Sequence, residues 1–170
     1  MTSNDIIGNE HAKRACDIAI KGKLKILFIG NSEAEDFVTC LNPTLNITAK
    51  ALQPCKCGSF EDPRVDCSCS PEQVLKQKRV IDNVSRNWAD IVVRTQSPSK
   101  DKVSQWLEET YKDILESDSL HLLTMGYDKL NLTVSELKKV IEVGKTIAEM
   151  DNSEKVLPLH TAEALQYRNR

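Results

Sequence analysis

The sequence predicts an α/β fold, in which a minimal three-stranded parallel sheet with flanking helices is followed by an all-helical C-terminal region. Two observations predict it. Short apolar runs alternate with helical patterns in the first part of the chain, which is typical of βαβ units with a parallel sheet. After the polar stretch 97–101, every segment with a pattern has helical periodicity. We therefore expect two domains, residues 1–97 and residues 101–170, with 97–101 as the boundary.

Three segments are expected to be strands. Residues 25–30 contain the continuous apolar run Ile26–Ile29 and end in a glycine, as a strand buried on both faces of a parallel sheet does. Residues 46–52 are the second strand candidate. Residues 90–95 are the third, because they are rich in β-branched side chains.

Three helices are expected among these strands. Residues 10–21 have small apolar side chains at helical spacing, and residues 33–41 form a short helix that Asn42-Pro43 would end. The third helix begins with Ser70-Pro-Glu-Gln73, which combines a serine cap, a proline at the first helical position and a glutamine three residues after the cap. It should run to about residue 84.

The C-terminal region is expected to contain at least three helices. Thr133–Glu136 is a capping box that opens a helix over residues 133–150, and a final helix is expected over 158–168. Residues 117–131 have no clear pattern. The first helix of the region has one apolar stripe, which consists of Val103, Trp106, Leu107, Tyr111, Ile114 and Leu115.

Charge and composition exclude several classes of function. The chain has 170 residues and a net charge of −2, so no overall field attracts it to nucleic acid or to an anionic membrane. The basic runs 21–25 and 76–79 lack interleaved aromatic residues, and we interpret both as solvated faces. The first thirty residues show no secretion signal and the apolar runs are too short to cross a bilayer. We therefore expect a cytoplasmic protein that binds neither membrane nor nucleic acid.

Four cysteines lie in a loop without periodicity, residues 53–70. They form two Cys-x-Cys pairs, Cys55 with Cys57 and Cys67 with Cys69. Four thiolates are the ligand set of a closed structural zinc site, so we expect these four to hold Zn²⁺ and to stabilise a loop too polar to fold by burial. Reduced, unligated thiols are the main alternative, and disulfides are the least favoured in a cytoplasmic chain. Cys16 and Cys40 fall on expected helices and fit small core residues.

Several motifs together resemble one family. The chain is similar, in order and over most of its length, to the magnesium-chelatase-like AAA+ ATPases of the ComM/YifB type. The cysteine loop and the C-terminal motif are specific to that family. The residues that carry the resemblance are 5–15, the strand to Gly30, Gln53–Gly58, Asp62–Arg64, Cys67–Pro71, Thr146–Glu149 and His160–Arg168.

The resemblance implies that Gly30 opens a phosphate-binding loop, and the residues that follow depart from its pattern. The family pattern is Gly-x-x-x-x-Gly-Lys-Ser/Thr, in which the backbone amides and the lysine hold phosphates and the hydroxyl holds Mg²⁺. Here Glu35 replaces the second glycine, Asp36 the lysine and Phe37 the hydroxyl residue. A carboxylate in place of the ammonium changes attraction of a polyphosphate into repulsion of about 1–4 kcal/mol. We therefore expect no ATP cofactor.

Other parts of the family's catalytic machinery are also missing. Residues 37–55 are too few for the insert that contains the acidic, metal-binding strand, and no apolar run ends in Asp-Glu. The resemblance also implies two arginines, and neither is found at its expected position. The first position falls near Trp88, with Arg86 close but displaced, and the second falls at about Ser135. The resemblance thus implies a reduced AAA+ core over residues 1–97, a helical lid-like region over 101–170, and no ATP hydrolysis.

We therefore expect no catalytic residues and a non-catalytic scaffold or interaction protein. Its partner would be a protein, such as a full-length AAA+ relative or a second copy of the chain. The alternatives are an ATP-binding or ATPase subunit with a degenerate phosphate loop and, less favoured, a DNA-associated accessory protein. Trp88 and Trp106 are possible partner anchors, although tryptophans on an apolar stripe belong more often to the core.

Overall fold

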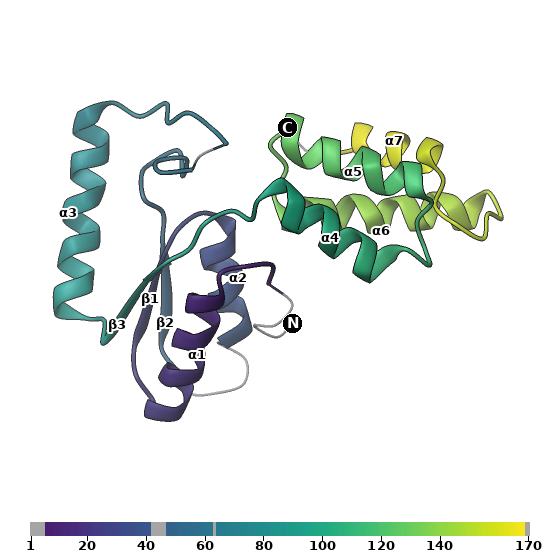
Figure 1. The fold of residues 1–170 in the computed structure, drawn as a ribbon. Helices are drawn as coiled ribbons and strands as arrows, with labels where there is room; N and C mark the ends of the chain where they lie inside the picture. The colour runs from purple at the N-terminus through teal and green to yellow at the C-terminus, as the bar shows by residue number, and fades with distance from the viewer. Residues whose placement is uncertain (1–5, 42–46, 63, 169–170) are drawn as a thin grey trace. The chain divides into compact units, whose positions relative to one another are not determined.

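The computed structural model describes residues 6–41, 47–62 and 64–168 and divides the chain into two compact units (Figure 1). The first unit is Met1–Pro98, and its described residues form three strands and three helices. The second unit, Ser99–Arg170, contains four helices in its described part. The expected fold class, a three-stranded parallel sheet followed by a helical region, is confirmed.

The sheet has the order β2-β1-β3, and both pairs of strands are parallel. β1 is Ile26–Ile29, β2 is Ala49–Leu52 and β3 is Ile91–Arg94. All four residues of β1 are buried, as expected for a central strand covered on both faces. The second strand begins later than the expected residue 46, and that position lies outside the described residues.

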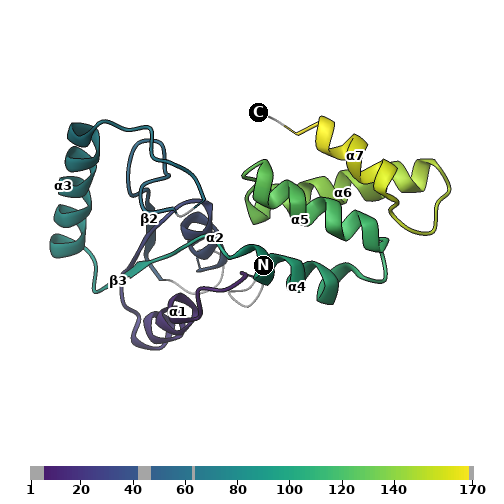
Figure 2. The ribbon, with the colours of Figure 1, turned by 45° about the horizontal axis from the view of Figure 1, so that its top comes forward.

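Two helices cover one face of the sheet. α1 is Glu10–Gly22 and α2 is Ser32–Leu41, and both lie on the side opposite α3 (Figures 1 and 2). The expected end of α2 at Asn42-Pro43 lies outside the described residues. Cys16 and Cys40 are buried in this part of the core, as expected, and burial raises the pKa of Cys16 to about 12. Phe37 of α2 stacks on Phe28 of β1, with ring centroids 5.1 Å apart.

One helix, α3, covers the other face. It is Pro71–Asn87, three residues longer than expected, and Ser70 forms the predicted capping box with Gln73. Ile81 is its one buried residue, and it packs against Leu27 and Ile29 of β1. Val84 and Trp88, near the C-terminal end of the helix, pack on the same cluster. The apolar contacts of α3 with the sheet therefore come mainly from its C-terminal half.

The helical unit consists of α4 (Lys100–Tyr111), α5 (Ser117–Lys129), α6 (Val134–Met150) and α7 (Pro158–Gln166). The segment without a clear pattern is thus a helix, α5. Ile114 is 37% exposed although its place on the expected stripe predicted burial, because α4 ends before this residue. Across the described residues of both units, no helix is long and apolar enough to cross a membrane.

A short backbone bridge joins two connecting segments of the helical unit, the one between α4 and α5 and the one between α6 and α7. Leu115, after α4, and Val156, before α7, form an isolated parallel β-bridge. The N–H of Val156 donates to the carbonyl of Ile114 at 2.9 Å, and the N–H of Glu116 donates to the carbonyl of Val156 at 3.1 Å. The buried hydroxyl of Ser119 donates to the same carbonyl at 2.8 Å. The segments between helices are therefore held by hydrogen bonds as well as by packing.

Candidate metal centre

The structure brings the four predicted cysteines together. The Sγ atoms of Cys55, Cys57, Cys67 and Cys69 all lie within 4.8 Å of one another. Three of the separations are 3.3 Å (Cys55 to Cys57), 3.7 Å (Cys55 to Cys67) and 3.6 Å (Cys57 to Cys67). All four are free thiols. Cys55 is buried, Cys57 is exposed, and the other two are half-buried.

This arrangement fits a tetrahedral ion with four sulfur ligands. Zinc–sulfur bonds of about 2.3 Å in a regular tetrahedron place the sulfur atoms about 3.8 Å apart. The three separations above are near or slightly below this value, so little movement of the loop would bring all four thiolates onto one ion. No nitrogen or carboxylate ligand is needed to complete the set. Such a site is closed and therefore structural in type, because no position is left for water or substrate.

The backbone of the loop prepares the cysteines for this role. The first pair lies on a tight turn in which the N–H of Gly58 donates to the carbonyl of Cys55 at 3.2 Å. Gly58 has a φ of +83°, a conformation that favours glycine. The N–H of Cys57 donates to the sulfur of Cys69 at 3.3 Å, and the N–H of Phe60 donates to the sulfur of Cys55 at the same distance. Such hydrogen bonds stabilise negative charge on sulfur.

The pKa values of two loop thiols, Cys57 and Cys67, depart from the ordinary value in opposite directions. The N–H of Ser59 and then the thiol of Cys55 lower the pKa of Cys57 to about 5. The pKa of Cys67 rises to about 12: the N–H of Cys69 lowers it, but desolvation and the sulfur atoms of Cys57 and Cys55 together outweigh that effect. Without a cation, Cys57 therefore loses its proton more readily than Cys67 does. A bound divalent cation would favour the thiolate form of all four.

Asp62 fixes the cysteine-bearing loop, residues 53–70 and called the metal loop below, to the sheet. Its side chain is 5% exposed, and its carboxylate accepts hydrogen bonds from Nδ2 of Asn31 at 3.0 Å and from Oγ of Ser97 at 3.1 Å. The N–H of Arg64 donates to it at 2.9 Å, and Nε of the same residue lies 3.6 Å away. Asn31 follows β1, and Ser97 lies three residues after the end of β3. Asp62 thus holds the loop over the carboxyl ends of two adjacent parallel strands.

Most of the positions that the resemblance assigned to a phosphate loop, from Ser32 onward, lie on α2. Gly30 follows β1 directly, and α2 begins two residues later at Ser32. A Cβ atom on Gly30 would lie 2.0 Å from Oγ1 and 2.9 Å from the carbonyl oxygen of Thr95, so this glycine permits a close approach of β1 to the segment after β3. A structural requirement alone accounts for Gly30.

The three substituted positions lie on α2. Glu35 is exposed, Asp36 is half-buried, and Phe37 is fully buried against Phe28. Glu33, one turn before Phe37, is 3% exposed, and its Oε1 atom has no hydrogen-bond partner among the described residues. Burial raises the pKa of Glu33 above its ordinary value. This segment carries buried and exposed carboxylates where phosphate binding needs positive charge.

Little open space remains at the carboxyl ends of the strands. A cavity of about 40 Å³ lies there, lined by residues that include Gly30, Asn31, Asp62 and Thr95. Ligands of open parallel sheets bind in the crevice outside these strand ends. A volume of this size holds about one water molecule and no nucleotide.

Sequence reasoning missed the role of Asp62 and of its partners. Asp62 entered only as part of a family motif, and no pattern links it to residues more than thirty positions away in the chain. The signal that could have indicated it is local: an acidic residue next to proline in a loop often accepts hydrogen bonds from nearby backbone groups.

The comparison with protein families supports the coarser part of the resemblance, a magnesium-chelatase-like family. The family model described as "Magnesium chelatase, subunit ChlI C-terminal" matches residues 75–168, which is more than half of the chain. The match begins within α3 and includes β3 and all four helices of the second unit. No curated protein matches the chain.

Proposed function

Because this chain belongs to the family of the magnesium chelatase subunit ChlI C-terminal domain, we propose that it is a non-catalytic member of that family. Its role is that of a zinc-stabilised scaffold or protein-interaction module derived from an AAA+ ATPase. Within the family we assign it to the ComM/YifB type, as a truncated and degenerate form. In this proposal the first unit corresponds to a reduced AAA+ core and the second to the helical lid.

The observation that carries the proposal is the conformation of the chain after β1. A phosphate loop leaves a strand, wraps around phosphate and then enters a helix. Here α2 begins at Ser32, and Phe37 occupies the core against Phe28 at the position that resembles the Mg²⁺-binding hydroxyl. A phosphate group near α2 would also meet the carboxylates of Glu35 and Asp36. Both features disfavour nucleotide binding.

The metal loop gives a second, independent argument. Asp62 attaches this loop over the carboxyl ends of β1 and β3, where a nucleotide would otherwise bind. The carboxylate itself is an anion next to the space that a phosphate would need. To bind nucleotide there, the chain would have to break the hydrogen bonds of Asp62 to Asn31 and Ser97.

A thermal-shift measurement tests the proposal directly. ATP with Mg²⁺ at millimolar concentration should leave the melting temperature of the pure protein unchanged, because a compound that does not bind the native state cannot stabilise it. An active magnesium-chelatase-like ATPase is the positive control. A reproducible rise in melting temperature with ATP and Mg²⁺ would refute the proposal, and so would ATP turnover by the pure protein.

The zinc part of the proposal has its own test. Protein purified without chelator should contain about one equivalent of zinc, and a Cys55→Ser, Cys67→Ser double variant should contain none. Free thiols in a reducing compartment agree with this site, so we place the protein in the cytoplasm. A folded, metal-free protein whose four loop thiols react readily with a thiol reagent would contradict the zinc site.

The proposed partner is a protein, either a full-length relative or a second copy of the chain. Family members assemble into rings, and a subunit without ATPase activity could dock onto an active one. Sedimentation of the pure chain tests whether it associates with itself. Affinity capture with full-length relatives from the same cell tests whether it binds one of them. A monomer that captures no relative would contradict this part.

A further inference from the structure

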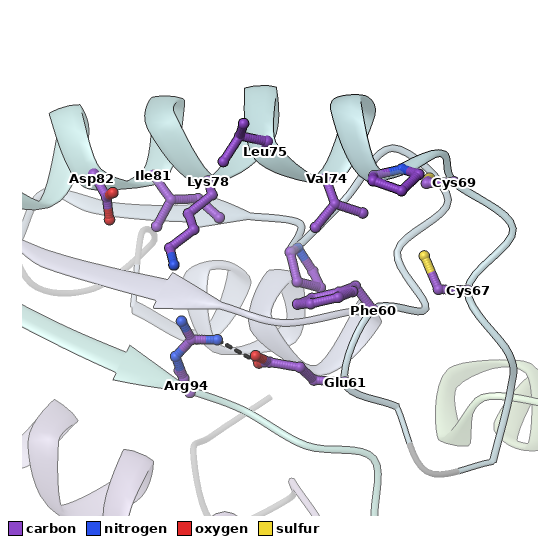
Figure 3. Close-up of a pocket in the computed structure, with 12 residues that line it drawn as sticks. Phe60, Glu61, Cys67, Cys69, Val74, Leu75, Lys78, Ile81, Asp82 and Arg94 are labelled. Carbon is purple, nitrogen blue, oxygen red and sulfur yellow. Dashed lines mark hydrogen bonds and ion pairs between the residues drawn. The ribbon is translucent and has the colours of Figure 1, made fainter.

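A cavity of the first unit lies beside the metal loop, and Cys67 and Cys69 are among the residues that line it. Its volume is about 530 Å³, and Figure 3 shows the residues that line it. One wall is the N-terminal half of α3, and the facing side is formed by Phe60 of the metal loop and Arg94 of β3. This volume is within the range of small-molecule sites, roughly 300–1,000 Å³.

The cavity exists because α3 covers the sheet incompletely. Val74 and Leu75 face the cavity, and Leu75 is 51% exposed. On the opposite side, Phe60 is 37% exposed. Apolar side chains on two facing walls therefore remain in contact with water, which is unfavourable. A ligand with an apolar body would fill the space between these two walls and remove their apolar side chains from water.

Two cations face each other across the cavity. The side chain of Lys78 extends from α3 toward Arg94 on β3 (Figure 3). Arg94 forms an ion pair with Glu61, which leaves its other N–H donors for a further acceptor. Lys78 has no ion pair or hydrogen bond with any residue that the structure describes, including Asp82 on the next turn. The approach of two like charges is unfavourable, and an anion between them would relieve it.

We propose that this cavity binds a small amphipathic carboxylate. The apolar body of the ligand lies between Phe60 and the Val74–Leu75 side of α3, and its carboxylate lies between Lys78 and Arg94. The chemistry requires a single negative charge, because Glu61 and Asp82 would repel a more highly charged anion. No covalent step is involved.

Three probes with the same eight-carbon chain test this site: octanoate, octylammonium and 1-octanol. Isothermal titration of the full chain, purified without chelator, should show octanoate binding with one site per chain and an affinity at least tenfold above that of octylammonium. In Lys78→Gln, octanoate affinity should fall about tenfold while that of octanol stays unchanged. Val74→Trp, which fills the cavity, should abolish binding of both.

Lys76→Gln is the matched control, because Lys76 lies on the same helix, is exposed and does not line the cavity. It should leave octanoate affinity unchanged. Far-UV circular dichroism confirms that each variant is folded, and Lys78→Gln changes only an exposed side chain. The proposal is overturned if octanoate shows no saturable binding at millimolar concentration, if octylammonium binds as tightly, or if Lys78→Gln and Lys76→Gln have equal effects.

Discussion

Among single residues, Asp62 has several structural roles. One carboxylate accepts from a side chain after β1, from a hydroxyl after β3 and from the backbone of its own loop. Because these donors are partly buried, each would lose a partner without gaining full contact with water if the carboxylate were removed. Asp62 therefore connects the stability of the sheet to the position of the metal ligands.

We expect Asp62→Ala to lower the free energy of unfolding of the first unit by about 2–3 kcal/mol, since it leaves three partly buried donors without this acceptor. Asp62→Asn keeps the side-chain carbonyl and should cost about half as much. Urea denaturation followed by circular dichroism measures both. Equal stability of Asp62→Ala and the parent protein would show that the contacts of this carboxylate contribute nothing.

Glu33 is a residue whose charge opposes folding. Burial is the first cause of its raised pKa, ahead of the opposing hydrogen bond from the backbone and attraction to Arg64. The folded state therefore holds the proton more tightly than the unfolded state, whose value is near 4.5. Where the pKa of a carboxyl group is raised on folding, stability decreases as pH rises above the unfolded value.

Glu33→Gln should therefore stabilise the first unit at pH 7 by on the order of 1 kcal/mol, because it removes the cost of a buried charge. The gain should shrink as the pH falls toward 4.5, where the parent carboxyl group is itself protonated. Melting temperatures of both proteins between pH 4 and pH 8 measure this. A gain that does not change with pH would assign the effect to packing rather than to charge.

Between whole elements, a glycine of α6 permits a close approach to α7 and to the segment before it. Gly144 of α6 lies where a Cβ atom would be 3.3 Å from Cγ1 of Val156 and 3.9 Å from the Cβ atom of Ala164. An alanine would require a shift of a few tenths of an ångström, and a branched side chain would require the helices to separate. Core overpacking of this kind costs about 1–3 kcal/mol.

Gly144→Val should destabilise the helical unit by about 1–3 kcal/mol through loss of this contact. Glu149→Val is the matched control: it places the same side chain on the exposed side of the same helix. Thermal denaturation followed by circular dichroism compares the two. If Gly144→Val loses no more stability than Glu149→Val, close contact with α7 does not limit the side chain at position 144.

At the scale of the whole molecule, all four proposed metal ligands belong to one of the two compact units. A metal that binds only the folded loop contributes its binding energy to the folding of that unit. Unfolding of the chain should then require two transitions rather than one.

A strong zinc chelator should lower the melting temperature of the first-unit transition by more than about 10 °C. The transition of residues 99–170 should stay where it was. Differential scanning calorimetry of the full chain, with and without chelator, resolves the two. Readdition of zinc should restore the first transition, and a parallel shift of both would contradict a site confined to the metal loop.

Those elements could be predicted whose residues follow a simple pattern of apolar side chains or of helix-capping residues. β1 is apolar at every position because both faces are covered, and the capping box at Ser70 marked the start of α3 correctly. α5 could not be predicted, because its buried side includes Ser119, Thr124 and Gly126, so polar and small residues replace the expected apolar stripe. The buried side of α5 packs through small and hydrogen-bonding residues, and an analysis of hydrophobic periodicity does not detect such a side.

The candidate site was predictable for a similar reason. Spacing alone indicated the four cysteines, because four sulfur ligands in one loop have few other uses. The Asp62 contacts and the large cavity were not predictable, since both depend on segments far apart in the chain. Trp88, considered as a partner anchor, is half-buried at the end of α3, with the ammonium of Lys50 4.2 Å from its ring.

The bridge between Leu115 and Val156 has a consequence for how the helical unit opens. Its two backbone hydrogen bonds join residues about forty positions apart, so neither can break by fraying of a single helix. Amide protons at Glu116 and Val156 should therefore exchange with deuterium only when all four helices unfold together. The slowest-exchanging sites of this unit then lie in two connecting segments, whereas in most helical bundles they lie in the middle of the helices.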